Sequence, residues 1–235
     1  EDILCRLSDK TRLIITNSPN NPTGGVITRE TWEVLAEGLA RWPETYLLSD
    51  EVYSRILYDD TEHVSALSID QLRSQTILLD GFSKTFAMTG WRVGYAVLPP
   101  PLNTLMTQLF SIDSGGVSHW VQSACVEGLD SELSEPEEMR KEFRARRDII
   151  VNGLNAIDGI SCTLPKGAFY VFPNVAGTGE SADVLCEFLL QKAHVAGVAG
   201  ASFGSNGSNN IRFSYAASRK EIAEAVRRIG SALGS

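Results

Sequence analysis

A succession of short apolar runs, with helix-like stretches between them, constrains the fold of this chain more than any other feature. The apolar runs are residues 12–16, 46–49, 76–80 and 92–98. Between the first two runs, residues 28–42 carry Trp32, Leu35 and Leu39 along one helical stripe. Strands that alternate with helices are typical of an α/β fold with a mostly parallel, doubly wound sheet.

The second half of the chain has a different pattern. Helices are expected near 101–112, 117–129, 136–156 and 181–192, and short strands near 161–163, 168–172, 195–198 and 211–214. A last helix is predicted to begin after Ser218, because Glu221 three residues later completes a capping box. The glycine-rich residues 204–210 are expected to form a mobile loop. The pattern predicts two domains, residues 1–130 and a smaller α+β domain of residues 131–235.

Composition excludes several classes of partner. The 235 residues are 43% hydrophobic and 21% charged, as in ordinary globular proteins, and the net charge of −8 argues against nucleic-acid binding. No apolar run is long enough to suggest a membrane span. The four cysteines (Cys5, Cys125, Cys162 and Cys186) and three histidines (His63, His119 and His194) are scattered. We therefore expect no metal site and reduced thiols in a cytoplasmic protein.

Polar residues follow three of the expected strands. Asn21 comes after the first strand, Asp50 ends the second and Lys84 follows the third. In open α/β sheets, ligands bind beyond the carboxyl ends of the strands, so these side chains are predicted to share one rim. Each residue alone also has a plain structural explanation. Asn21 could simply belong to a turn. Asp50 could cap a helix or form an ion pair on the surface, and Lys84 could be a solvated surface lysine.

Five motifs in a fixed order point to a family. They are NPTG (21–24), SDEVY (49–53), SKTFAMTGWRVGY (83–95), GAFYVFP (167–173) and NIRFSYAAS (210–218). Together they resemble the class I/II aminotransferases, the fold-type I enzymes that depend on pyridoxal 5'-phosphate. The resemblance implies that residues 1–130 are part of the cofactor-binding large domain and that residues 131–235 are the C-terminal small domain.

The resemblance also implies a role for each matching residue. Lys84 would hold the cofactor aldehyde as a Schiff base and later carry the substrate proton. Asp50 would favour the protonated pyridine nitrogen. Tyr53 and Asn21 would hydrogen-bond the phenolic oxygen of the cofactor, with Asn21 also near the substrate. Arg92 would neutralise the phosphate, and Arg212 would take the substrate α-carboxylate in a bidentate pair.

Three departures from the family pattern matter. Many relatives have a phosphate-binding serine three residues before the lysine, where this chain has Gly81; Ser83 is a weaker candidate for that contact. Residues 103–139 contain no arginine or lysine, which weakens an aspartate-specific interpretation. Members of the family place about 150 residues before the NPTG turn, whereas this chain has 20, so we expect a C-terminal part with an incomplete cofactor pocket and weak activity.

The predicted function is the transfer of an amino group between an α-amino acid and a 2-oxo acid. A carbon–sulfur lyase on the same scaffold is the nearest alternative. An aminotransferase-like ligand-sensing domain of a transcription regulator is an alternative of another class, and a folded but inert pseudo-enzyme is a third. A homodimer is expected from the resemblance, because the family shares its active sites across an interface.

Overall fold

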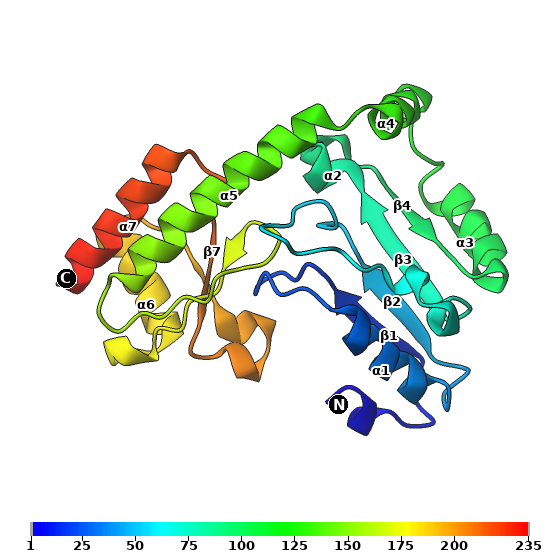
Figure 1. Ribbon diagram of the computed structural model, residues 1–235, viewed down its shortest axis with the longest axis horizontal. Helices are drawn as coiled ribbons and strands as arrows, with labels where there is room; N and C mark the ends of the chain where they lie inside the picture. The colour runs from blue at the N-terminus through cyan, green and yellow to red at the C-terminus, as the bar shows by residue number, and fades with distance from the viewer. Residues whose placement is uncertain (1, 235) are drawn as a thin grey trace. The chain divides into compact units, whose positions relative to one another are not determined.

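The computed structural model describes residues 2–234, which form two compact units (Figure 1). The first unit comprises the residues up to Pro19 together with Val26–Glu137. The second comprises Asn20–Gly25 and the residues from Glu138 onward. The division thus falls a few residues after the expected position at 130, and the short turn at Asn20–Gly25 groups with the C-terminal unit.

A four-stranded sheet organises the first unit (Figure 1). Its strands are β1 (Leu13–Asn17), β2 (Tyr46–Asp50), β3 (Thr76–Gly81) and β4 (Gly94–Val97), in that spatial order. The first three strands are parallel, and β4 runs antiparallel to β3. The predicted mixed α/β fold with a mostly parallel sheet is confirmed.

One face of this sheet carries the hydrophobic core. Helix α1 (Arg29–Leu39) begins after Thr28, whose side chain accepts a hydrogen bond from the Thr31 backbone. Trp32 and Leu39 of α1 are fully buried in a cluster that includes Ile14 and Leu47 of the strands. Successive strand residues point to opposite faces. The other face of β1 therefore presents Ile15, which is 68% exposed.

The remaining helices of the first unit follow β3 and β4. They are the short α2 (Phe82–Thr85), α3 (Pro100–Asp113) and α4 (His119–Asp130). Strand β4 begins at Gly94, later than the predicted 92, because Thr89–Trp91 form a 3₁₀ turn and Arg92 has a left-handed backbone with φ of 54°. Extended backbone requires a negative φ, so the strand cannot include Arg92.

The second unit packs helices against a small antiparallel sheet. Its strands are β5 (Tyr170–Val171), β6 (Val198–Ala199) and β7 (Ile211–Ser214), with β7 in the centre. Its helices are α5 (Ser134–Asn155), which begins in the first unit, α6 (Ala182–Phe188) and α7 (Arg219–Leu233). The core includes Leu154 of α5, Leu185 of α6 and Ile222 of α7.

Several elements of the second unit are shorter than predicted. The strand expected at 161–163 is reduced to one bridge between Ser161 and Asn174. The helix expected at 181–192 ends at Phe188 and continues as one π-helical turn, Leu189–Ala193. The expected loop at 204–210 contains a 3₁₀ turn at Ser205–Gly207.

Within residues 2–234, no helix has the length and apolar character needed to cross a membrane.

The predicted capping box at the start of α7 is confirmed. The Ser218 hydroxyl accepts from the Glu221 backbone N–H at 3.2 Å, and a Glu221 carboxylate oxygen accepts from the Ser218 N–H at 2.9 Å. Ser218→Ala is expected to lower the free energy of unfolding by about 1 kcal/mol, measured by urea denaturation. Ser231→Ala, at an exposed position inside the same helix, is the control and should not destabilise the chain. Equal losses in both variants would contradict the role of the cap.

Candidate active site

Asp50 lies at the carboxyl end of β2, beside the ends of β1 and β3. It pairs with Asn17 of β1 and Leu79 of β3 in the parallel register. The Asn17 side chain donates to the Asp50 backbone carbonyl at 3.1 Å, and the Asp50 carboxylate accepts from the Val52 backbone N–H at 3.2 Å. These contacts hold the Asp50 carboxylate at the rim where ligands of such sheets bind.

The electrostatic environment of Asp50 disfavours its charge. Burial raises the pKa of the Asp50 carboxyl group, the nearby Glu51 charge raises it further, and the Val52 N–H opposes the shift in part. A carboxylate in this position is stabilised by an incoming positive charge or N–H donor. The site therefore favours a cationic group of a ligand at Asp50.

Lys84 and Tyr53 approach each other near the same strand ends. The Lys84 ammonium nitrogen is 5.9 Å from the centre of the Tyr53 ring, and Tyr53 is only 4% exposed. Lys84 belongs to α2, which is anchored by the buried side chains of Phe82 and Thr85 on either side. Because the flanking residues are fixed in the core, the backbone of Lys84 is fixed as well, and the half-buried side chain is directed from a rigid base.

A buried acid fixes the segment between Asp50 and Tyr53. The Glu51 side chain accepts hydrogen bonds from the Ser49 hydroxyl at 2.9 Å, the Ser65 hydroxyl at 3.0 Å and the Ala66 backbone at 3.1 Å. Its second oxygen lies 2.7 Å from Nε2 of His63. Glu51 is 3% exposed, so this network ties the end of β2 to the 63–66 segment. Sequence reasoning missed it, because the partners lie in a loop without a motif.

Asp80, a half-buried acid at the end of β3, links this segment to that strand. Its side chain accepts from the Tyr95 hydroxyl at 3.1 Å, from the Ser54 hydroxyl at 3.4 Å and from the Gly81 N–H at 2.7 Å. Burial raises the pKa of Asp80, and burial together with the Asp80 charge raises the pKa of Tyr95 to about 12. Ser54 follows Tyr53, and Asp80 precedes α2, so the network connects the two elements that carry Tyr53 and Lys84.

The position of Gly81 has a physical explanation. A Cβ atom at Gly81 would lie 3.0 Å from the Cα atom of Gly94 and 3.2 Å from the carbonyl oxygen of Val93. Strands β3 and β4 are too close at this point for a serine side chain without a local shift. A serine at position 81 would therefore require β4 to shift slightly at Val93 and Gly94.

Arg92 is exposed beside the β3–β4 connection. Its guanidinium donates to the Thr89 carbonyl at 3.0 Å, and its backbone has the left-handed conformation described above. Such a conformation in a residue other than glycine is uncommon and is concentrated at functional sites. Arg92 thus presents an accessible cationic head.

The second unit contains the other two predicted residues. The Arg212 guanidinium of β7 donates to the Asn21 side-chain oxygen at 3.0 Å. The turn that carries Asn21 is held by Gly24, whose carbonyl accepts from the Lys166 and Gly167 backbones at 3.0 Å each. Gly24 has φ of +69°, and a Cβ atom there would collide with Pro165. The structure therefore brings Asn21 and Arg212 together, although 191 positions separate them in the sequence.

Two aromatic residues near Arg212 were not predicted as site residues. The central guanidinium carbon lies 4.7 Å from the Tyr170 ring centre and 5.0 Å from the Phe203 ring centre. Tyr170 belongs to the GAFYVFP motif, which was a usable signal. Phe203 precedes a glycine-rich segment and has no such signal, since its role depends on a loop conformation.

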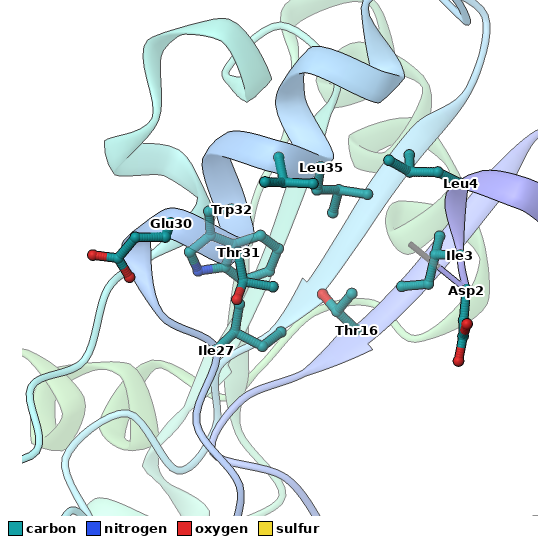
Figure 2. Close-up of a pocket in the computed structure, with 10 residues that line it drawn as sticks. Asp2, Ile3, Leu4, Thr16, Ile27, Glu30, Thr31, Trp32 and Leu35 are labelled. Atoms are coloured by element: carbon teal, nitrogen blue, oxygen red, sulfur yellow. The ribbon is translucent and has the colours of Figure 1, made fainter.

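Two hollows of the first unit differ in chemistry. A cavity of about 420 Å³ is lined by Glu51, His63, Asp80 and Tyr95, so the two acidic networks face it. Figure 2 shows a larger hollow of about 650 Å³ beside α1, where Ile3, Leu4, Ile27, Trp32 and Leu35 lie around Thr16 of β1. The hollow in Figure 2 is mainly apolar and contains none of the predicted site residues.

Comparison with known proteins decides the family. Residues 1–229 match the family described as Aminotransferase class I and II. The chain belongs to this family. It is 43% identical over 234 residues to an aspartate aminotransferase of Pyrococcus horikoshii, a match that covers 99% of this chain and 59% of the relative. It is 38% identical over 229 residues to aromatic-amino-acid aminotransferase 2 of Thermococcus litoralis, covering 97% of this chain and 58% of the relative.

Solved aminotransferase structures share the fold. An aromatic aminotransferase from Pyrococcus horikoshii superposes with a TM-score of 0.95 at 37% identity, covering 99% of this chain and 62% of that structure. The aspartate aminotransferase from Rhizobium meliloti also gives a TM-score of 0.95 at 37% identity, covering 99% of this chain and 60% of that structure. The chain thus spans about 59% of the length of the curated aminotransferase that it matches at 43% identity.

Proposed function

We propose that this chain supplies the lysine-bearing and carboxylate-binding parts of a pyridoxal-phosphate-dependent aminotransferase. The observation that carries the proposal is the placement of Lys84 beside the buried ring of Tyr53, next to the strand end that carries the half-buried Asp50. The second unit contributes the hydrogen-bonded pair of Arg212 and Asn21. The proposed reaction moves an amino group between an α-amino acid and a 2-oxo acid.

The residues present suit the cofactor chemically. A raised pKa at Asp50 means that its charged form lacks stabilisation, and a protonated ring nitrogen of the cofactor would provide it. Tyr53 and Asn21 would hydrogen-bond the phenolic oxygen, and the exposed guanidinium of Arg92 would neutralise phosphate oxygens. When bound, pyridoxal phosphate supplies an electron sink for the negative charge that develops at the substrate α-carbon.

The chain's own residues would bind the substrate and move its proton. The planar Arg212 guanidinium would take the substrate α-carboxylate in a bidentate pair, which fixes the orientation of the α-carbon. Lys84 Nζ, as a free amine, would accept the proton from the substrate α-carbon, hold it as an ammonium and return it to the product. Tyr53, buried against Lys84, would hold the amine in place.

The relatives favour transamination over a lyase or a ligand-sensing role. A carbon–sulfur lyase and a ligand-sensing domain of a regulator would share this scaffold, but the relatives described above carry the names of aspartate and aromatic aminotransferases. The lack of arginine and lysine in residues 103–139 weakens an aspartate-specific interpretation, so the proposal names the donor only as an α-amino acid. We further propose a homodimer, because active sites of this kind are shared between protomers. We also propose a cytoplasmic location, since the four scattered cysteines suit a reducing compartment.

A labelling experiment tests the proposed role of Lys84. The chain is incubated with pyridoxal phosphate, treated with borohydride and digested, and the peptides are analysed by mass spectrometry. The cofactor mass is expected on the peptide that contains Lys84, and Lys84→Ala should lose it. Lys10→Ala, at an exposed lysine of the same unit, is the matched control and should retain it. Equal labelling of several lysines, unchanged in Lys84→Ala, would contradict the proposal.

A further inference from the structure

The guanidinium of Arg212 lies in an aromatic environment within the second unit. Its central carbon is 4.7 Å from the ring centre of Tyr170 and 5.0 Å from that of Phe203. Both distances are within the range of cation–π attraction, which is about 6 Å. One of its nitrogens is already bound to the Asn21 oxygen at 3.0 Å. Two kinds of contact therefore restrain the guanidinium.

The three restraining residues come from different parts of the chain. Asn21 belongs to the turn after β1, Tyr170 lies on β5 and Phe203 ends the 3₁₀ turn Gly200–Phe203. Tyr170 is built into the sheet, because it pairs with Ser214 of β7. Phe203 is 39% exposed. Of the three restraining residues, it therefore contributes least to the core.

Hydrogen bonds and a close backbone crossing anchor the loop that carries Phe203. The Gly200 N–H donates to the Asn210 carbonyl at 2.7 Å, and the Asn210 side chain donates to the Phe172 carbonyl at 2.8 Å. A Cβ atom at Gly200 would collide with the Gly207 carbonyl, so the two backbones cross in close contact. The Phe203 ring also meets the Phe172 ring edge-on, with centres 6.0 Å apart. These contacts, all within the second unit, place the Phe203 ring beside Arg212.

We propose that Phe203 is a positioning residue for the carboxylate of the substrate. Its ring holds the Arg212 guanidinium so that one nitrogen stays on Asn21 while other in-plane N–H groups remain available to a planar carboxylate. A guanidinium that is already oriented loses less conformational freedom when it binds. Removal of the ring leaves the charge of Arg212 unchanged but lets its side chain explore other rotamers, so affinity for carboxylates falls.

This inference rests on the proposed function, since it assigns the carboxylate to Arg212. Two measurements on the 235-residue chain distinguish the contact between Phe203 and Arg212 from the binding of the carboxylate. The first is the NMR signal of the Arg212 Nε–Hε group in the ¹⁵N-labelled chain, identified by its loss in Arg212→Lys. Protons over aromatic rings resonate upfield, so Phe203→Leu is expected to move this signal downfield.

The second measurement is the affinity for pyruvate, the smallest 2-oxo acid with an α-carboxylate. Binding is monitored through the Arg212 Nε–Hε signal. Pyruvamide, which has the same shape but no charge, is the matched ligand. Phe203→Leu is expected to weaken pyruvate binding by about threefold to fivefold, as the loss of one partly exposed cation–π contact implies. Pyruvamide binding should not change. Phe188→Leu is the control variant: it is the same substitution in the same unit, at a half-buried residue that lines a different groove.

Each outcome has a defined meaning. A shifted signal with weaker pyruvate binding, in Phe203→Leu and not in Phe188→Leu, supports the positioning role. An unchanged signal, or a shifted signal with unchanged pyruvate affinity, overturns it. If the parent chain binds pyruvate no better than pyruvamide, the assignment of the carboxylate to Arg212 fails and the positioning role fails with it. The lysine labelling described above is independent of this result, so loss of the carboxylate site and loss of the cofactor site are distinguishable.

Discussion

Asp50→Asn is expected to weaken the binding of pyridoxal phosphate by about tenfold to hundredfold, and to stabilise the chain without the cofactor at pH 7. The loss of affinity reflects a charge-assisted hydrogen bond worth about 1.5–3 kcal/mol. The gain in stability arises because the variant removes a carboxylate whose charge is unfavourable in the folded chain. Burial raises the pKa of Asp50, so its ionised form is a cost to the folded chain until a positive group binds.

The pH dependence of this stability follows from the direction of the shift. The pKa of Asp50 in the folded chain lies above its unfolded value, so the folded state binds the proton more tightly. The corresponding stability is fully present below the unfolded pKa, near 3.9, and is lost as the pH rises through the folded pKa. The stability advantage of Asp50→Asn should therefore be present at pH 7 and shrink as the pH falls towards 3.9.

Cofactor titrations and urea unfolding at several pH values measure the two effects. Asp60→Asn, at an exposed position of the same unit, is the control and should change neither quantity. A variant at Asp50 that lost stability at pH 7 would show that the carboxylate has a structural role. A variant with unchanged cofactor affinity would remove Asp50 from the proposed site.

The sequence was most informative for elements that are defined by residues close together in the chain. The strands that end near Asn21, Asp50 and Lys84 were predictable because each is a short apolar run followed by a polar residue. The capping box at Ser218 was predictable because its two partners are three residues apart. In these cases, the forces that define the element act between residues close in the chain.

The rest of the candidate site depends on contacts between distant segments. Glu51 meets His63 and Ser65 across a loop, and Asp80 meets Tyr95 across two strands. Glu51 lies within the SDEVY motif, but neither local sequence indicates these partners, because burial and partner choice depend on the tertiary fold. The two-residue strands β5 and β6 illustrate the same point, since each is defined by pairing with β7 rather than by its own apolar pattern.

The buried Glu51 side chain is expected to make a large contribution to the stability of the first unit. Glu51→Ala should lower the free energy of unfolding by about 3 kcal/mol or more, because several buried donors lose their acceptor together. The Ser49 and Ser65 hydroxyls and the Ala66 N–H all bond to one Glu51 oxygen. Glu62→Ala, at an exposed acid in the adjoining loop, is the control and should change stability by less than about 0.5 kcal/mol.

Glu51→Gln separates the hydrogen bonds from the charge. The amide oxygen can still accept from the three donors on one side, but the amide nitrogen then faces Nε2 of His63, which is 2.7 Å from the present oxygen. His63 must then accept at Nε2 and carry its proton on Nδ1, which is buried and has no hydrogen-bond partner among residues 2–234. A buried N–H without an acceptor costs about 1–3 kcal/mol. Urea unfolding should therefore place Glu51→Gln between the parent chain and Glu51→Ala, whereas equal stability of Gln and Ala variants would show that the three donors on the first oxygen contribute nothing.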